Sequence, residues 1–154
     1  MTEIISALKL VYDSISASDI TWALTGSLAF YIRGIDVSVG DIDIQTDKDG
    51  AYEIERSLMR YVIEPVEFRT AQKIRSHFGK LLVDGVSVEI MGDIEKLAPN
   101  GIWLSTPPLR SIIEEVNFGE MCIPLLNLEY EYQAYSLMGR TRKAEILKNW
   151  LNWY

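Results

Sequence analysis

Two segments decide the fold of this chain: Thr21-Trp22-Ala23-Leu24-Thr25-Gly26-Ser27 and, after a short connection, Gly40-Asp41-Ile42-Asp43-Ile44-Gln45. The first segment predicts a strand that ends in a tight turn and opens a short helix, because glycine permits unusual dihedrals and serine caps helices. The second segment predicts a strand whose period of two puts Asp41 and Asp43 on one face and both isoleucines on the other. The isoleucine face can then enter a hydrophobic core.

The two aspartates would lie side by side and repel each other unless a cation sits between them. Oxygen ligands on a rigid strand suit Mg²⁺ or Mn²⁺, which prefer carboxylates together with phosphates. Taken alone, an Asp-x-Asp pair is common on exposed strands, and Gly26-Ser27 is an ordinary strand-to-helix turn. Together the two motifs are more informative. Gly26-Ser27 can donate hydrogen bonds to a phosphate, and Asp41 and Asp43 can bind a metal, so the combination predicts a nucleoside triphosphate site.

The bulk composition is that of one globular domain. The chain has 154 residues, of which 48% are hydrophobic and 24% charged, and both fractions are ordinary for a globular protein. This length is enough to bury about two-thirds of the unfolded surface. We expect a single α/β domain over 1–154, with a core at about 18–125 and a C-terminal helical segment at about 127–154.

Charge and cysteine content exclude some classes of partner. The formal net charge of −7 gives no overall attraction to nucleic acids or anionic membranes, so a nucleic-acid acceptor is disfavoured. One cysteine rules out an intramolecular disulfide and fits a cytoplasmic location. Cys122 stands among Met121, Ile123 and Leu125, which predicts a buried, unreactive thiol. No apolar run approaches membrane-spanning length, and the N-terminus lacks the features of a signal peptide.

The middle of the chain predicts a capped helix followed by one short strand. We expect Asp47 to cap the helix rather than bind a metal, and the buried side of that helix to consist of Ile54, Leu58 and Met59. Glu64-Pro65 should interrupt the chain before a strand at 66–68. Residues 70–74 are expected to form a short helical or irregular connection.

A hairpin is predicted over 81–91, with Asp84-Gly85 at its turn. On its second arm, Glu89 falls on the face opposite to Val88 and Ile90. An acid among apolar residues is costly to bury unpaired. Glu89 must therefore lie exposed, meet a basic partner or bind a cation. Gly92-Asp93 is expected to close this strand.

The C-terminal third predicts a strand pair and two helices. Residues 112–116 and 121–125 read as the strands, with a helix over 111–115 as the alternative. From Asn127 onward the chain reads as two helices broken at Gly139, and the inner side of the second comprises Ala144, Leu147, Trp150 and Leu151. The terminal aromatic residues are expected to pack on the core or supply an oligomer contact: Trp150, Trp153 and Tyr154.

Three motifs resemble the signature of the nucleotidyltransferase superfamily, which has a DNA polymerase beta-like fold: Leu24-Thr25-Gly26-Ser27-Leu28-Ala29, Arg33-Gly34 and Asp41-Ile42-Asp43. In that superfamily a Gly-Ser precedes an Asp-x-Asp, and a third carboxylate follows on a later strand. Glu89 is the residue that matches this third position. The resemblance covers roughly 20–92, and to small stand-alone prokaryotic proteins assigned as nucleotidyltransferases it extends through 128–135.

The resemblance implies a mixed, twisted sheet flanked by helices, and a metal-dependent transfer of a nucleoside monophosphate from a triphosphate to a hydroxyl. It implies that Asp41 and Asp43 hold two divalent ions, Mg²⁺ or Mn²⁺. Glu89 would complete the site and help to remove the proton of the acceptor. Gly26 and Ser27 would bind the β- and γ-phosphates. The acceptor would be a small molecule or a protein.

Several basic residues keep two interpretations. Arg33 either makes a surface salt bridge or helps to neutralise the triphosphate. The cluster of Arg140, Arg142 and Lys143 is either a solvated helix start or a contact for phosphates, and superfamily relatives often carry a basic residue near the nucleotide there. His77, the only histidine, is expected to be structural, with a site-lining role as the alternative.

Two other functional classes stay open beside the enzyme. One is a nucleotide-binding module that has kept the fold and lost turnover. The other is a component of a toxin–antitoxin type of pair that acts on a partner protein. The intact acid triad argues against the module without turnover.

Overall fold

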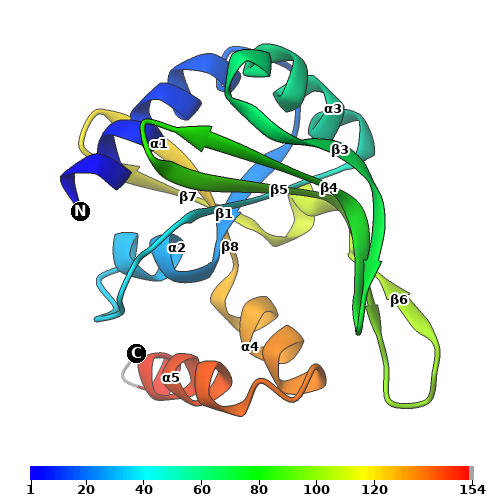
Figure 1. Ribbon diagram of the computed structural model, residues 1–154. Coiled ribbons are helices and arrows are strands. Elements are labelled where there is room, and N and C mark those ends of the chain that lie inside the picture. Colours follow the sequence, from blue (N-terminus) through cyan, green and yellow to red (C-terminus); the bar gives the residue numbers. More distant parts are fainter. Residues whose placement is uncertain (153–154) are drawn as a thin grey trace.

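The computed structural model describes residues 1–152, and its centre is one mixed β-sheet with helices on both faces (Figure 1). The strands follow the order β3-β4-β5-β2-β1-β8-β7, and β6 pairs with β5. Their bounds are β1 Trp22–Thr25, β2 Ile42–Thr46, β3 Val62–Ala71, β4 Ile74–Val83, β5 Val86–Leu97, β6 Trp103–Ser105, β7 Ile113–Phe118 and β8 Met121–Leu126. The helices are α1 Thr2–Ile15, α2 Gly26–Ile32, α3 Lys48–Ser57, α4 Leu128–Leu137 and α5 Thr141–Asn152, with 3₁₀ turns η1 Met59–Tyr61 and η2 Leu109–Ile112.

The centre of the sheet has the mixed character that was predicted. β2 runs antiparallel to β1 and parallel to β5, while β1 runs parallel to β8. Ile42 and Ile44 are fully buried, and Asp43 between them is half-buried. The predicted division of β2 into an apolar and an acidic face is therefore confirmed.

The core fills the space between this apolar face and the helices α1 and α3, which lie over the sheet in Figure 1. Leu8 of α1 and Ile54 of α3 have no exposed surface, since each falls on the apolar stripe of its helix. A second, smaller cluster joins α2 to the C-terminal helices and consists of Phe30, Ile35, Leu128 and Leu147. α4 and α5 lie on the opposite side of the sheet from α1 and α3 (Figure 1).

Several local predictions are confirmed. The side chain of Asp47 accepts a hydrogen bond from the backbone N–H of Gly50 at 2.7 Å and caps α3. Asp84 and Gly85 form the β4–β5 turn with φ values of 49° and 83°, which suits a two-residue hairpin. β7 and β8 pair as predicted, and α5 buries Ala144 and Leu147. Trp150 packs on the second cluster, whereas Trp153 and Tyr154 lie outside the described residues.

The strand expected at 66–68 lies within β3, but the break at Glu64-Pro65 and the irregular connection at 70–74 were wrong, because β3 and β4 form one long hairpin. β3 includes Glu64 and Pro65, and the pairing shifts its register around them. An edge strand tolerates proline, since one side of it has no partner strand. Gln72, with φ of 43°, turns the chain into β4 where an irregular connection was expected.

The expected end of the strand at Gly92-Asp93 was also wrong. Arg75 pairs with Glu95, and His77 pairs with Gly92. These pairs are two residues apart in β4 and three apart in β5, so β5 contains one extra residue. Asp93 accommodates it with a φ of 49°. Such a β-bulge bends the strand and changes the face on which later side chains lie.

Two burial predictions were wrong. Met59 is 57% exposed, since α3 ends at Ser57 and Met59 lies in η1. Cys122 is exposed because the alternation of β8 turns Ile123 and Leu125 inward and Cys122 outward. Its thiol lies 3.4 Å from Glu115, whose carboxylate raises the pKa of the thiol.

None of the described helices is long and apolar enough to cross a membrane.

Candidate functional site

Three carboxylates meet where β2 and β5 run side by side. Asp43 and Glu89 are register partners across these parallel strands, and Asp41 lies directly before β2. Carboxylate oxygens of Asp41, Asp43 and Glu89 all lie within 4.8 Å of one another. The structure thus brings together the three acids that the sequence singled out.

The surroundings of Asp43 favour a cation. Burial and, to a smaller extent, the carboxylates of Asp41 and Glu89 together raise the pKa of Asp43 to about 7, against the opposing charge of Lys143. Within residues 1–152, neither aspartate has a basic group within 4.0 Å. An oxygen-only donor set with unbalanced negative charge fits a hard divalent ion such as Mg²⁺ or Mn²⁺.

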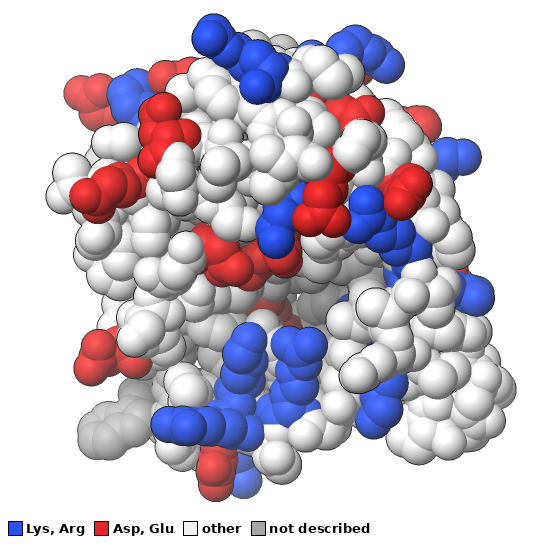
Figure 2. All heavy atoms as spheres, viewed as in Figure 1, with Lys and Arg blue, Asp and Glu red and all other residues white. Residues whose placement is uncertain are grey.

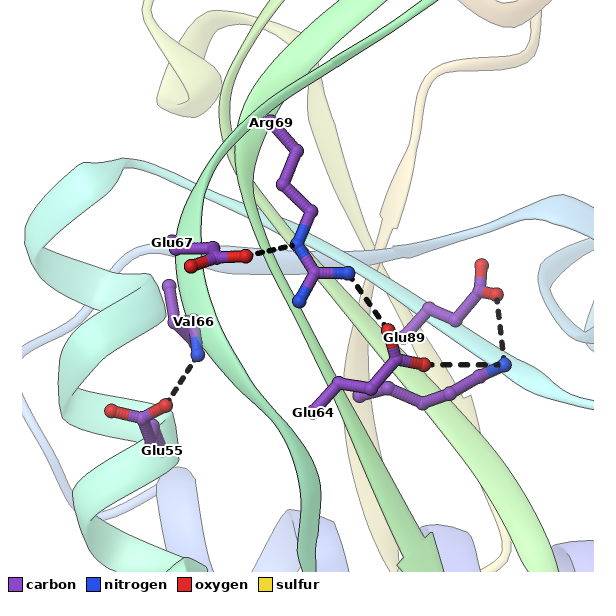
Figure 3. A network of polar contacts seen from close by, with 7 residues as sticks. Glu55, Glu64, Val66, Glu67, Arg69 and Glu89 are labelled. Carbon is purple, nitrogen blue, oxygen red and sulfur yellow. Dashed lines mark hydrogen bonds and ion pairs between the residues drawn. The ribbon is translucent and has the colours of Figure 1, made fainter.

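Glu89 has a basic neighbour as well. Its carboxylate lies 3.9 Å from the Nζ of Lys80, which also approaches Glu64 at 4.0 Å (Figure 3). Arg69 then joins Glu64 at 2.7 Å and Glu67 at 3.0 Å. At 3.9 Å the contact with Lys80 is weak, and the side chain of Glu89 keeps 29% of its surface exposed. Glu89 therefore remains free to coordinate a metal.

The turn before α2 fits closely against Asp43. Gly26 has a φ of +72°, and a Cβ there would lie 2.5 Å from the Oδ2 of Asp43. Only glycine meets both conditions, since other residues rarely adopt this dihedral and would collide with the carboxylate. Ser27 follows in the first turn of α2.

A fourth acid, Glu131 of α4, completes the inner end of the site. Its side chain is 3% exposed, and its Oε1 accepts hydrogen bonds from the hydroxyl of Thr25 and, at 3.5 Å, from the backbone N–H of Gly26. Its Oε2 is buried and has no hydrogen-bond partner among the described residues. Burial raises the pKa of Glu131 to about 7, against the effects of Thr25, Gly26 and Arg33.

Glu131 was not predicted as a site residue, although the sequence contains a signal for it. Leu128, Glu131 and Tyr135 follow the spacing of one buried helix face. An acid on such a face needs hydrogen-bond partners. Tyr135, also largely buried, has its pKa raised by that burial and by the nearby charge of Glu131.

These groups open into a cavity of about 730 Å³ between the sheet and α4–α5. In Figure 2 it is a hollow with acidic side chains on its upper side and basic side chains below and to the right. Gly26, Asp43, Glu89 and Glu131 line it. Its basic lining residues are Arg69, Lys73, Lys96, Arg140 and Lys143. Arg140 and Lys143 are thus exposed to the cavity rather than only to solvent, whereas Arg142 is not among the lining residues.

Other predicted residues lie outside the cavity lining. Arg33 donates to Glu114 at 3.2 Å and to the backbone carbonyl of Leu126 at 3.1 Å, so it makes the ion pair that was one of its two interpretations. Ser27 and Asp41 are also absent from the lining, although Asp41 belongs to the acid cluster. The Nδ1 of His77 lies 3.2 Å from the hydroxyl of Tyr52, which confirms the structural role.

A second cavity of about 540 Å³ is lined by residues that include Thr21, Asp47, Asp93 and Arg110. None of the three clustered carboxylates lines it. We therefore place the candidate site in the larger cavity.

A glycine-bounded turn at a short helix, an Asp-x-Asp pair on the next strand and a third carboxylate on its parallel neighbour define a nucleotidyltransferase. More narrowly, the chain belongs to the aminoglycoside-2''-adenylyltransferase family, whose family model matches residues 7–148. No curated protein matches the chain.

Solved structures agree with this assignment. The crystal structure of a protein from Thermotoga maritima, assigned as a nucleotidyltransferase, is 47% identical with a TM-score of 0.86, over 99% of this chain and 95% of the other. The lincosamide antibiotic adenylyltransferase LnuA, solved with lincomycin, is 17% identical with a TM-score of 0.57, over 96% of this chain and 95% of that one. ANT(2'')-Ia in complex with adenylyl-2''-tobramycin is 10% identical with a TM-score of 0.55, over 98% of this chain and 90% of that one. The last two share the fold.

Proposed function

We propose that this protein transfers a nucleoside monophosphate from a metal-bound triphosphate to the hydroxyl of a small molecule. Asp41, Asp43 and Glu89 would hold two divalent ions, Mg²⁺ or Mn²⁺. The observation that carries this proposal is the clustering of the three carboxylates within 4.8 Å beside a half-buried, desolvated Asp43. Three acids gathered in this way repel one another, so the arrangement is costly unless cations bind it.

The chemistry needs no protein nucleophile. The acceptor oxygen forms a bond to the α-phosphorus, the bond from that phosphorus to the bridging oxygen breaks, and pyrophosphate leaves. Divalent ions held by the acids would stabilise charge on the attacking and leaving oxygens. Glu89, whose side chain is 29% exposed beside Lys80, would accept the proton of the acceptor hydroxyl.

Other residues of the chain would bind the triphosphate. Gly26, which lies directly against Asp43, would offer its backbone to the phosphates. Ser27, the next residue in α2, would add its hydroxyl and its backbone N–H. Arg140 and Lys143 line the cavity and form no ion pair within 4.0 Å with any described acid. Their charges suit the negative charge that develops on pyrophosphate.

The acceptor is proposed to be a small molecule rather than a protein. A cavity of about 730 Å³ is of the size that encloses small ligands. The related enzymes LnuA and ANT(2'')-Ia were solved with lincomycin and with adenylyl-2''-tobramycin, respectively. The family name, an adenylyltransferase, makes ATP the expected donor.

A titration of Mg²⁺ with each of the four ribonucleoside triphosphates tests the site, with thermal stability as the measurement. We expect wild type to gain several degrees with metal and ATP together, and Asp41→Asn and Asp43→Asn to lose that gain. Asp84→Asn is the matched control, because Asp84 lies in the β4–β5 turn and asparagine adopts its φ of 49° readily. If no triphosphate stabilises wild type with either metal, the proposed nucleotide site fails.

A further inference from the structure

Four of the five basic residues that line the cavity form two groups at different places, and the fifth, Arg69, is paired with Glu64 and Glu67. Arg140 and Lys143 come from the C-terminal helices, and the charge of Lys143 reaches Asp43. Lys73 and Lys96 come from the far part of the β3–β4–β5 sheet. We call Lys73 and Lys96 the distal basic pair.

Lys96 is a nearly buried cation without an acidic partner. It is 9% exposed, and its Nζ lies 3.2 Å from the hydroxyl of Tyr130 and 5.3 Å from the centre of that ring. Within residues 1–152, no carboxylate lies within 4.0 Å of it. A buried charge normally has a counter-charge. The open side of Lys96 faces the cavity, so a ligand is the partner that can supply it.

The backbone places Lys73 beside Lys96. Lys96 is the register partner of Ile74, and the carbonyl of Lys73 accepts a hydrogen bond from the N–H of Leu97 at 2.8 Å. Lys73 also lacks an ion pair within the described chain. The neighbouring arginines differ, because Arg69 is paired with Glu64 and Glu67, and Arg75 with Glu95.

The bulge at Asp93 turns Lys96 into the cavity. Before the bulge, Glu89 and Met91 line the cavity; after it, Ile94 and Lys96 do. A regular strand would have placed odd-numbered residues there throughout. The seven positions from Glu89 to Lys96 correspond to roughly 20 Å of extended strand, so the two side chains enter the cavity from different parts of β5.

We infer that the acceptor carries an anionic group, a phosphate or a carboxylate, which the distal basic pair binds. This inference rests on the proposed nucleotidyl transfer and narrows its acceptor. The acids that line the cavity are Asp43, Glu89 and Glu131, all near the reacting centre. The part of the cavity around the distal basic pair therefore has no acid that could bind a polyamine such as tobramycin. The two lysines would instead repel a polyamine.

The test compares sugars that differ only in the group at carbon 6, which is neutral in glucose and anionic in glucose 6-phosphate and glucuronate, with tobramycin as the polycation. Their binding is measured by calorimetry without nucleotide, in wild type, Lys96→Met and Lys96→Arg. Lys48→Met is the control, since Lys48 is exposed at the start of α3. We expect one of the anionic sugars to bind wild type at least tenfold more tightly than glucose does. Lys96→Met should lose that preference, while Lys96→Arg and Lys48→Met keep it.

Stability gives a second readout. If Lys96 is an unpaired buried charge, Lys96→Met should melt at a higher temperature than wild type without ligand. A lower melting temperature would assign Lys96 to holding Tyr130, and would overturn the inference. Equal binding of glucose and the anionic sugars, or preferred binding of tobramycin, would overturn it as well.

Nucleotide binding separates this inference from the function it rests on. We expect Lys96→Met to bind Mg²⁺–ATP as wild type does. A tenfold loss would place Lys96 at the triphosphate and refute its role toward the acceptor. If wild type itself fails to bind Mg²⁺–ATP while Lys96-dependent binding of the anionic sugar persists, the proposed transfer fails and the anion site stands.

Discussion

Thr25 donates its hydroxyl to the buried carboxylate of Glu131, a residue 106 positions later in the chain. The same carboxylate accepts the N–H of Gly26, whose Cα faces Asp43. α4 is thereby fixed to the turn that opens α2, and the C-terminal helices form one wall of the cavity rather than an appendage. Glu131 connects the nucleotide side of the site to the fold.

The buried carboxyl of Glu131 should make the protein less stable as pH rises. Its pKa is about 7 in the fold against an ordinary value of 4.5, so between these pH values the folded state holds a proton that the unfolded state has released. The stability that this carboxyl contributes is present below pH 4.5, and about 3 kcal/mol of it is lost by pH 7. The pKa of Asp43 is also raised to about 7, so this carboxyl likewise makes the protein less stable as pH rises.

Glu131→Gln should reduce this pH dependence, because glutamine keeps an acceptor for Thr25 and does not ionise. Urea unfolding at pH 5 and pH 8 in EDTA measures it. The variant should lose less stability between the two values than wild type does. Glu3→Gln, at an exposed position of α1, should behave as wild type. An unchanged pH dependence in Glu131→Gln would contradict the raised pKa.

Gly26→Ala should damage the site and the fold together. The new Cβ would lie 2.5 Å from the Oδ2 of Asp43, at a φ of +72°. We expect a loss of about 1–3 kcal/mol in the free energy of unfolding, and at least tenfold weaker binding of Mg²⁺–ATP. Gly85→Ala is the control: its φ is +83° and nothing lies within 4 Å of its Cβ position. That variant should lose stability only, and equal loss of binding in both would refute the contact argument.

Glu89→Gln should keep the fold and bind nucleotide but lose turnover. A general base contributes on the order of 10²–10⁴ in rate, and glutamine cannot take the proton. Labelled transfer from ATP and a melting curve measure the two properties. Lys80→Met, which removes the neighbour at 3.9 Å and leaves the carboxylate, should stay active. If Glu89→Gln unfolds, Glu89 is structural and its assignment as a ligand fails.

Arg33→Met should lower stability without affecting nucleotide binding. The side chain is 13% exposed, and it bonds Glu114 and the carbonyl of Leu126. Removal of these bonds should cost about 1–3 kcal/mol, measured by urea unfolding. The dissociation constant of Mg²⁺–ATP should stay within twofold of wild type. A tenfold weaker affinity with intact stability would support the other interpretation, that Arg33 neutralises the triphosphate.

The part of the site that depends on strand alternation could be predicted from the sequence. The period of two placed Asp43 opposite Ile42 and Ile44, and placed Glu89 opposite Val88 and Ile90. These positions need only local geometry. Whether the two strands would be neighbours depended on the resemblance, since no local rule pairs β2 with β5.

The rest depends on contacts distant in sequence or on exceptions to the alternation. The sequence marks Glu131 as an acid on a buried helix face, but its position beside Gly26 follows only from the packing of α4 on that turn. Asp93 reads as an ordinary turn residue, whereas pairing with β4 keeps the strand going through it. Pro65 reads as a break, and the edge position of β3 makes it tolerable.

The extra residue in β5 also makes two properties of the protein separable by mutation. Upstream of Asp93 the strand carries Glu89, and downstream it carries Lys96, on the same side of the sheet only because the bulge intervenes. Deletion of one residue there would exchange the inward and outward side chains of the downstream segment and leave the upstream register intact. A one-residue deletion at this point would therefore turn Lys96 away from the cavity while Glu89 stays beside Asp43.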